Sequence, residues 1–257
     1  MPDATVEGAI LHYETAGEGP PLVLLHGIGS NSRSWRRQLE GLSGKFRVIA
    51  WDAPGYGRSS DPPDKQIKPS ILFYVECVRS LVDSLELKDI FLLGHSAGGV
   101  VAQEFYRAYP DYVRALVLAD TRNVASQAGL EERLRSIRTV TSAQLAAERA
   151  PKLLRRNAPA ELIQEVESIM SEVRAAGYEF AAIALAESDT RDVIRNLRIP
   201  TLLIWGSEDE ITPVWDEVPS GVELKIIPDA GHLCYIEQPE QFNDIVRDFL
   251  EGCRRRL

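Results

Sequence analysis

Residues 94–98 read Gly-His-Ser-Ala-Gly and place Ser96 between two glycines in the pattern G-x-S-x-G. An apolar run at residues 90–93 precedes this pentapeptide, and a helical pattern begins near Ala97. A sharp turn from a strand into a helix would expose the Ser96 hydroxyl, and glycines are needed there because side chains would collide with neighbouring backbone. Ser96 is therefore the candidate nucleophile. The simpler alternative is a plain turn whose serine caps the following helix.

A serine hydroxyl becomes a good nucleophile only when a base removes its proton. The chain has four histidines, and His232 lies in a loop between the last predicted strand and the last predicted helix. Ligands of open parallel sheets bind at this carboxyl end of the strands, so we predict that His232 is the base. We expect His12 to be a surface or half-buried residue, His26 to hydrogen-bond its own loop, and His95 to point elsewhere.

The base in turn needs an acid that holds its tautomer and stabilises its charge. Asp209 follows the predicted strand at residues 201–205 and reaches the same edge of the sheet. Asp120, at the end of the run 115–119, is a rival because it also lies at the carboxyl end of a strand. We predict Asp209 as the acid, which gives the chain order serine, aspartate, histidine.

The elements that would position these residues are short apolar runs alternating with amphipathic helical segments. The runs are rich in Val, Leu and Ile, as expected of parallel strands that are buried on both faces. Alternation of strands and helices favours an α/β fold. The predicted strands are residues 22–25, 48–51, 90–93, 115–119, 201–205 and 224–227.

The alternation stops between residues 122 and 187, where only helical periodicity is found. The sequence therefore predicts one core domain, residues 1–121 and 188–257, that is interrupted by a helical insertion, residues 122–187. Within the insertion, apolar residues share one helical face. They are Leu162, Ile163, Val166, Ile169, Met170 and Val173.

With these motifs the chain resembles the α/β-hydrolase family, over almost its whole length outside the insertion. Residues 26–29 are similar to the H-G-x-G loop of that family, and residues 52–59 to its D-x-P-G-x-G-x-S turn. Residues 206–213 resemble G-x-x-D-x-x-x-P, and residues 231–232 resemble the histidine loop.

The resemblance implies a mostly parallel central sheet flanked by helices, with a helical cap inserted after the sixth strand and lying over the site. It also implies an oxyanion hole formed by the backbone N–H groups of Ile28 and Ala97. A serine at position 96 argues against haloalkane dehalogenases and epoxide hydrolases, which use aspartate there. The expected reaction is hydrolysis of a small-molecule ester or lactone through an acyl-enzyme, with no metal or organic cofactor.

Other functions on the same scaffold stay open at this point. Hydrolysis of a carbon–carbon bond in a ring-cleavage diketone uses the same three residues. A non-catalytic small-molecule receptor is the alternative from another class, although an intact nucleophile, acid, base and oxyanion loop argue against it. The cofactor-independent dioxygenase and hydroxynitrile lyase branches are further from the observed motifs.

Four residues are candidates for substrate contact because they lie beside the catalytic motifs. Trp35, Trp215 and Tyr235 could line an apolar pocket, and core packing explains each of them equally well. Arg122 could pair with a substrate carboxylate, and a solvated arginine at the hinge of the cap is the simpler alternative. Residues 133–138 contain three arginines, which we expect on an exposed face of a cap helix.

The composition excludes several classes of partner. The 257 residues have a formal net charge of −9, which repels nucleic acid and anionic lipid. Three widely spaced cysteines form no disulfide framework or zinc motif. Residues 1–20 lack the features of a secretory signal, and no apolar stretch is long enough to span a membrane. We expect a cytoplasmic protein of undetermined oligomeric state.

Overall fold

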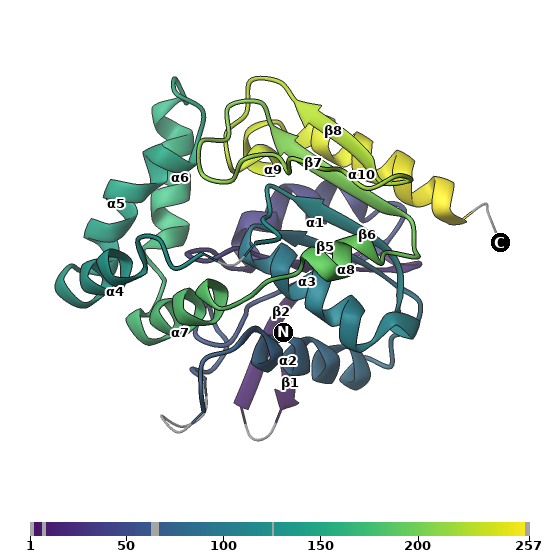
Figure 1. Cartoon of the computed structure of the whole chain (residues 1–257), viewed down its shortest axis with the longest axis horizontal. Coiled ribbons are helices and arrows are strands. Elements are labelled where there is room, and N and C mark those ends of the chain that lie inside the picture. The colour runs from purple at the N-terminus through teal and green to yellow at the C-terminus, as the bar shows by residue number, and fades with distance from the viewer. Residues whose placement is uncertain (1–2, 7–8, 63–66, 125, 255–257) are drawn as a thin grey trace.

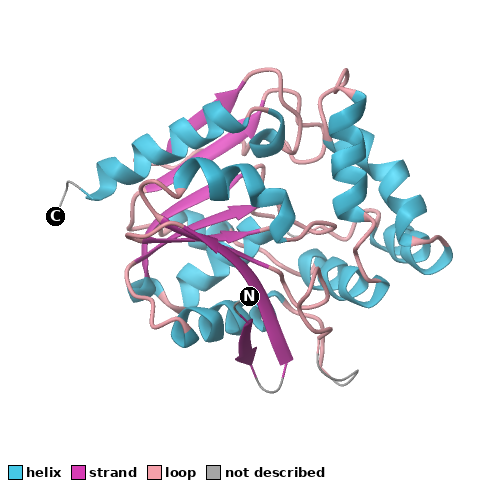
Figure 2. Cartoon of the chain, turned by 180° about the vertical axis from the view of Figure 1, so that it is seen from behind, coloured by secondary structure: helices cyan, strands magenta, loops and turns pink. Residues whose placement is uncertain are grey.

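The computed structural model describes residues 3–6, 9–62, 67–124 and 126–254. Eight strands of this part of the chain form one twisted sheet in the order β1-β2-β4-β3-β5-β6-β7-β8 (Figures 1 and 2). β2 pairs with β1 and β4 in antiparallel fashion, and all other neighbours are parallel. The strands are β1 (Asp3–Val6), β2 (Ala9–Ala16), β3 (Pro21–Leu25), β4 (Arg47–Trp51), β5 (Ile90–His95), β6 (Val113–Ala119), β7 (Thr201–Gly206) and β8 (Glu223–Ile227).

The six predicted strands are confirmed as β3 to β8, and the mostly parallel sheet is the predicted α/β arrangement. β3 to β7 are almost entirely buried, which explains why their sequences are continuous apolar runs. β8 differs because it is an edge strand, and Ile226 on it is 45% exposed. The predicted strands did not include β1 and β2.

Alternate residues of each central strand face two separate hydrophobic cores. Phe91 and Leu93 of β5 pack with the helices on one face of the sheet, which are α1 and α10. Leu92, between them, packs with α2, α3 and α8 on the other face. Helices therefore cover both faces (Figure 2). Their bounds are α1 (Arg36–Leu42), α2 (Ile71–Ser84), α3 (Ala97–Ala108), α8 (Arg191–Arg195), α9 (Cys234–Glu237) and α10 (Pro239–Arg254), with short 3₁₀ turns at Ser32–Trp35 and Pro110–Tyr112.

Four further helices follow β6, the sixth strand, and form a group at one side of the sheet (Figure 1). They are α4 (Leu130–Thr139), α5 (Ser142–Leu153), α6 (Ala160–Met170) and α7 (Ala175–Ala186). Between Ala119 and Thr201 the described residues contain no strand, in agreement with the helical periodicity. All four helices lie inside the predicted cap, residues 122–187, and we keep this name for them.

Close approach of β3 to the start of α3 depends on a residue without a side chain. A Cβ atom at Gly98 would lie 2.2 Å from the carbonyl oxygen of Leu25 and 2.6 Å from that of His26. Both neighbours are backbone atoms of the sheet edge, so neither can move aside without disturbing the sheet.

We therefore expect Gly98→Ala to lower the free energy of unfolding by about 3 kcal/mol or more, because the added methyl group overpacks a rigid backbone contact. Urea unfolding followed by circular dichroism measures this change. The control is Gly252→Ala in α10, where the added Cβ atom has no neighbour within 4 Å. There we expect no loss, or a gain of up to about 1 kcal/mol from helix propensity. Equal stability of the two variants would contradict this account of Gly98.

Candidate active site

Ser96 lies in the turn between β5 and α3 with a strained backbone, φ 52° and ψ −119°. Bonds to the neighbouring strand and its following loop hold this conformation. Its N–H donates to the carbonyl oxygen of Ala119 at 3.0 Å, and its own carbonyl accepts from the Thr121 hydroxyl at 2.6 Å. The predicted strand–turn–helix setting of the serine is therefore present.

His232 lies in the loop between β8 and α9 and meets Ser96 across the sheet edge. Its Nε2 is 3.0 Å from the Ser96 Oγ, and its Nδ1 is 2.9 Å from Oδ2 of Asp209. The side chains of His232 and Asp209 are 4% and 1% exposed. The structure thus brings together the three residues predicted as nucleophile, base and acid, with both hydrogen bonds shielded from bulk water.

The Asp209 carboxylate is fixed by its own loop. Its second oxygen, Oδ1, accepts hydrogen bonds from the backbone N–H groups of Ile211 at 2.8 Å and Thr212 at 3.1 Å. The carboxyl group is therefore fixed with its other oxygen, Oδ2, facing the Nδ1 edge of His232.

Asp120, the rival acid, lies beside Asp209 and also hydrogen-bonds other groups. Its Oδ1 accepts from the N–H of Gly206 at 2.9 Å, and Cys234 Sγ donates to its Oδ2 at 2.9 Å. Complete burial and then the nearby charge of Asp209 raise the pKa of Asp120 well above its usual value. Two carboxyl groups so close together cannot both ionise easily. The geometry therefore favours Asp209 as the partner of His232 and leaves Asp120 as a neutral, buried support.

The other histidines only partly match their predicted places. His26 does hydrogen-bond its own loop, since Nδ1 donates to the Gly27 carbonyl at 2.9 Å and Nε2 accepts from the Ala53 N–H at 3.0 Å. His12 is buried, not on the surface. His95 does not point away from the site: its Nε2 donates to the backbone oxygen of His232 at 2.7 Å. Burial lowers the pKa of His95 well below its usual value, so this ring is a neutral support for the histidine loop.

The two loops predicted for the oxyanion hole both reach the nucleophile. Ile28 and Ala97 line the same cavity as Ser96. Ala97 is the first residue of α3, so its N–H has no partner within the helix and lies at the positive end of the helix dipole. Asp52 steadies the loop that contains Ile28, because its carboxylate accepts from the N–H groups of Ser32 at 2.7 Å and Arg58 at 2.8 Å.

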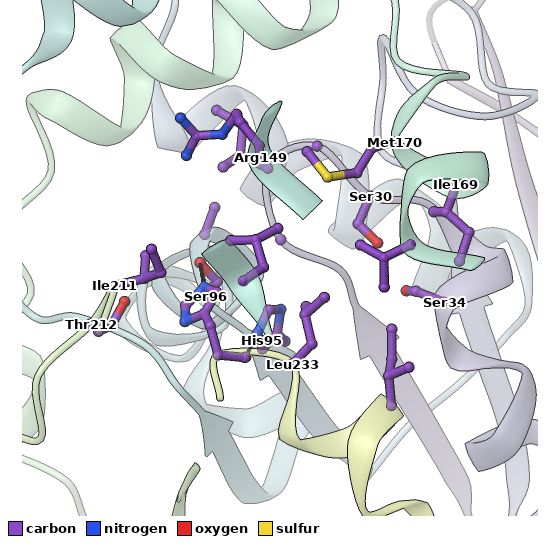
Figure 3. Close-up of a pocket in the computed structure, with 18 of the residues that line it drawn as sticks. Ser30, Ser34, His95, Ser96, Arg149, Ile169, Met170, Ile211, Thr212 and Leu233 are labelled. Atoms are coloured by element: carbon purple, nitrogen blue, oxygen red, sulfur yellow. Dashed lines mark hydrogen bonds between the residues drawn. The ribbon is translucent and has the colours of Figure 1, made fainter. Parts of the chain in front are cut away.

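A cavity of about 110 Å³ opens above Ser96, between the sheet edge and the cap (Figure 3). One buried water needs roughly 10 to 15 Å³ on this scale, so the cavity has room for a small organic molecule. Its apolar wall includes Val166, Ile169 and Met170, which belong to the helical face predicted in the insertion. The helical periodicity predicted this apolar face, but only the structure shows that the face lines the cavity.

The three aromatic residues considered for the pocket are core residues instead. Trp35 and Tyr235 are fully buried and stack on each other with ring centroids 4.1 Å apart. Trp215 is 8% exposed, and its Nε1 donates to the Thr121 carbonyl at 2.7 Å. None of the three is among the described residues that line the cavity. These residues are close in sequence to the predicted catalytic motifs. That closeness could not show whether a side chain packs in the core beneath the cavity or lines the cavity itself.

Arg122 lines the cavity and is half-buried, so it is not the solvated hinge residue of the simpler alternative. One of its terminal nitrogens donates to the Leu185 carbonyl. Arg133 of α4 also lines the cavity, contrary to the expected exposed face, as does Arg149 of α5. Sequence reasoning gave Arg149 no role, since an isolated cationic residue in an amphipathic helix carries no distinguishing signal.

Glu237 in α9 is a second residue that the sequence did not single out. Its buried carboxyl group accepts from the backbone N–H groups of Gly231 at 2.6 Å and Arg155 at 3.0 Å. These bonds tie the histidine loop to the end of α5 and the segment that follows. Burial raises the pKa of Glu237. A glutamate in a helix is usually exposed, so only the tertiary contacts identify this one as a support of the site.

One group of side chains has the composition of a metal site. Donor atoms of Asp120, Asp209 and His232 all lie within 4.8 Å of one another. Each of them already takes part in the hydrogen bonds described above, and these bonds account for the grouping. Among the described residues, no helix is long and apolar enough to cross a membrane.

Comparisons with known proteins show which proteins this chain resembles in sequence and fold. A thermophilic esterase from Thermogutta terrifontis is 30% identical, with a TM-score of 0.89 over 98% of both chains. The enol-lactonase of Burkholderia xenovorans is 26% identical, with a TM-score of 0.88 over 97% of this chain and 100% of its own. The 3-oxoadipate enol-lactonase 2 of Acinetobacter baylyi is 28% identical over 94% of this chain and 93% of its length. The family model described as "Alpha/beta hydrolase family" matches residues 22–245, and the chain therefore belongs to the alpha/beta hydrolase family.

Proposed function

We propose that this protein is a serine hydrolase that cleaves a carboxylic ester or lactone of a small molecule through an acyl-enzyme. The observation that supports it most strongly is the unbroken hydrogen-bonded series Ser96, His232, Asp209, with distances of 3.0 and 2.9 Å. A nucleophile, a base and an acid at hydrogen-bond distance are what acyl transfer requires.

In the proposed mechanism His232 Nε2 removes the proton as Ser96 Oγ attacks the substrate carbonyl carbon. Asp209 accepts the hydrogen bond of the Nδ1 proton of His232 and stabilises the imidazolium. The backbone N–H groups of Ile28 and Ala97 stabilise the oxyanion. His232 then protonates the leaving alcohol, activates a water molecule against the acyl-enzyme, and returns the proton to Ser96 as the acid leaves.

The relatives support the ester and lactone chemistry. The similar proteins described above are named as an esterase and as enol-lactonases. The cavity above Ser96 has a volume of about 110 Å³, which suits a small-molecule substrate. Carbon–carbon bond hydrolysis uses the same three residues, so assays on ring-cleavage diketones separate that alternative from the proposal.

Ser96→Ala should abolish covalent labelling by a fluorophosphonate and lower kcat for a short-chain p-nitrophenyl ester by about 10⁶-fold, because no other group can form the acyl-enzyme. Ser30→Ala is the matched control, since Ser30 lines the same cavity, and the side-chain hydrogen bonds of His232 within the described chain go to Asp209 and Ser96. It should be labelled like the wild type. A wild-type protein that is neither labelled nor active would contradict the proposed function and favour the receptor alternative.

Asp209→Asn should lower kcat by several orders of magnitude, because an amide cannot hold the His232 tautomer or stabilise its charge. Asp120→Asn should lower kcat less than tenfold, because an amide can still accept from the Gly206 N–H and remains neutral like the buried acid. Steady-state kinetics on one ester compares the two variants. The opposite ranking would identify Asp120 as the acid.

The raised pKa of Asp120 predicts a pH dependence of stability. The folded state keeps the Asp120 proton above about pH 4, whereas the unfolded chain loses it near that pH. The contribution of Asp120 is therefore fully present below about pH 4 and is lost as the pH rises toward the folded-state pKa. An asparagine side chain does not titrate, so the stability of Asp120→Asn relative to the wild type should increase from about pH 4 to about pH 7.

Urea unfolding at several pH values measures this difference, with Asp111→Asn as the control for loss of an exposed acidic residue. A constant difference between Asp120→Asn and the wild type across this range would contradict a neutral Asp120.

A further inference from the structure

The ionisable side chains that line the cavity belong only to arginine and histidine residues among the described part of the chain. They include three arginines from separate segments: Arg122 after β6, Arg133 in α4 and Arg149 in α5. No aspartate or glutamate is found among the described residues of the lining. This is unexpected in a chain whose net charge is −9. A positive cavity in a negative protein focuses its field on the ligand that enters.

None of the three guanidinium groups is neutralised within the described chain. No carboxylate of the described residues lies within 4.0 Å of Arg122, Arg133 or Arg149, whereas Arg138 on the same helix as Arg133 is paired with Glu179. The Nε of Arg122 is also buried without a hydrogen-bond partner. Burial and then the positive charge of Arg133 lower the pKa of Arg122. Two guanidinium groups are therefore held near each other without an acidic partner.

Such an arrangement is unfavourable by itself, because a partly buried charge loses hydration and gains no counterion. An anionic group between the arginines would recover this loss. The planar guanidinium is suited to bidentate contact with a carboxylate or phosphate. We infer that the substrate carries a second, negatively charged group, a carboxylate or a phosphate, which the arginines of the cap and its hinge bind.

The inference rests on the proposed function, because it places the anion and the scissile bond in one molecule. Ser96 and Arg149 lie on opposite sides of the same cavity (Figure 3), and Met170 is also part of its lining. Leu153 and Ile169 add to the apolar wall. A short apolar spacer between the ester and the anion matches this lining and its volume of about 110 Å³.

Two matched pairs of substrates test the inference. The p-nitrophenyl half-ester of glutaric acid is compared with p-nitrophenyl valerate, for a charge on the acyl side. 4-Acetoxybenzoate is compared with its neutral methyl ester, for a charge on the alcohol side. At least one acidic substrate should have a KM about tenfold or more below that of its neutral partner. Added salt should raise that KM, because it screens the attraction.

Arg133→Gln and Arg149→Gln should each raise KM for the acidic substrate about tenfold and change KM for the neutral one less than twofold. Arg135→Gln is the matched control, because Arg135 is exposed on α4 and lies outside the lining of the cavity. This substitution removes the same unit of charge. It should leave both KM values unchanged. Arg122 is half-buried, so the variant used at this position is Arg122→Lys and not a glutamine variant. Lysine keeps the positive charge but lacks the planar guanidinium that makes bidentate contacts.

The Ser96→Ala protein separates this inference from the proposed function. Calorimetric titration with glutarate should give binding that Arg149→Gln weakens about tenfold and Arg135→Gln does not. Titration with inorganic phosphate identifies which anion is preferred. An enzyme that hydrolyses neutral esters but shows no acidic preference in either pair, and binds neither anion, would overturn the inference alone. Failure of all turnover with intact glutarate or phosphate binding would overturn the proposed function and leave the anion site standing.

Discussion

The strained backbone of Ser96 is the constraint on which the rest of the site depends. A φ of 52° is costly for a residue with a side chain, and it persists only because β5, β6 and α3 define the turn from both sides. The turn needs close backbone contacts, and the missing side chain of Gly98 permits the nearest of them. The parallel sheet supplies those contacts, since it brings the ends of adjacent strands to one edge.

The same edge explains how loops far apart in the chain form one site. Asp209 follows β7, His232 follows β8, and the oxyanion loop follows β3, so neighbouring strands deliver them within hydrogen-bond distance. The side chains that support these loops hydrogen-bond to backbone groups of the loops. His95 donates to the carbonyl of His232, and Glu237 accepts from the N–H of Gly231. Neutral or fully satisfied side chains thus fix the loops without placing a competing charge against His232.

Charge is distributed unevenly around this centre. Beside His232, two carboxyl groups differ in environment: Asp209 accepts backbone N–H donors, and Asp120 is fully buried with a raised pKa. Their interaction favours one ionised and one neutral form. The cavity that Ser96 lines contains arginines that no carboxylate of the described residues neutralises. The cap thus does more than cover the site, because it changes the electrostatic environment in which a substrate would be held.

The sequence by itself determined the fold class and the core strands. It also predicted Ser96, His232 and Asp209 as one group, and the structure places these three residues at hydrogen-bond distance. These features are local: a buried strand reads as an apolar run, and a catalytic loop reads as a fixed spacing of glycine, serine, aspartate and histidine. The run at residues 224–227 predicted β8 as a strand but did not predict that it is an exposed edge strand. The reason is that an apolar run does not show the order of the strands in the sheet.

Only the tertiary structure decided which side chains reach the cavity. Trp35, Trp215 and Tyr235 are adjacent to catalytic motifs yet pack in the core, whereas Arg133 and Arg149 come from cap helices without a motif. Whether a side chain faces the core, the solvent or the substrate depends on how separate helices pack against one another, and residue spacing along one helix does not contain that information. The same physical reason hid Glu237 and the neutral state of Asp120, since burial arises from segments distant in the chain.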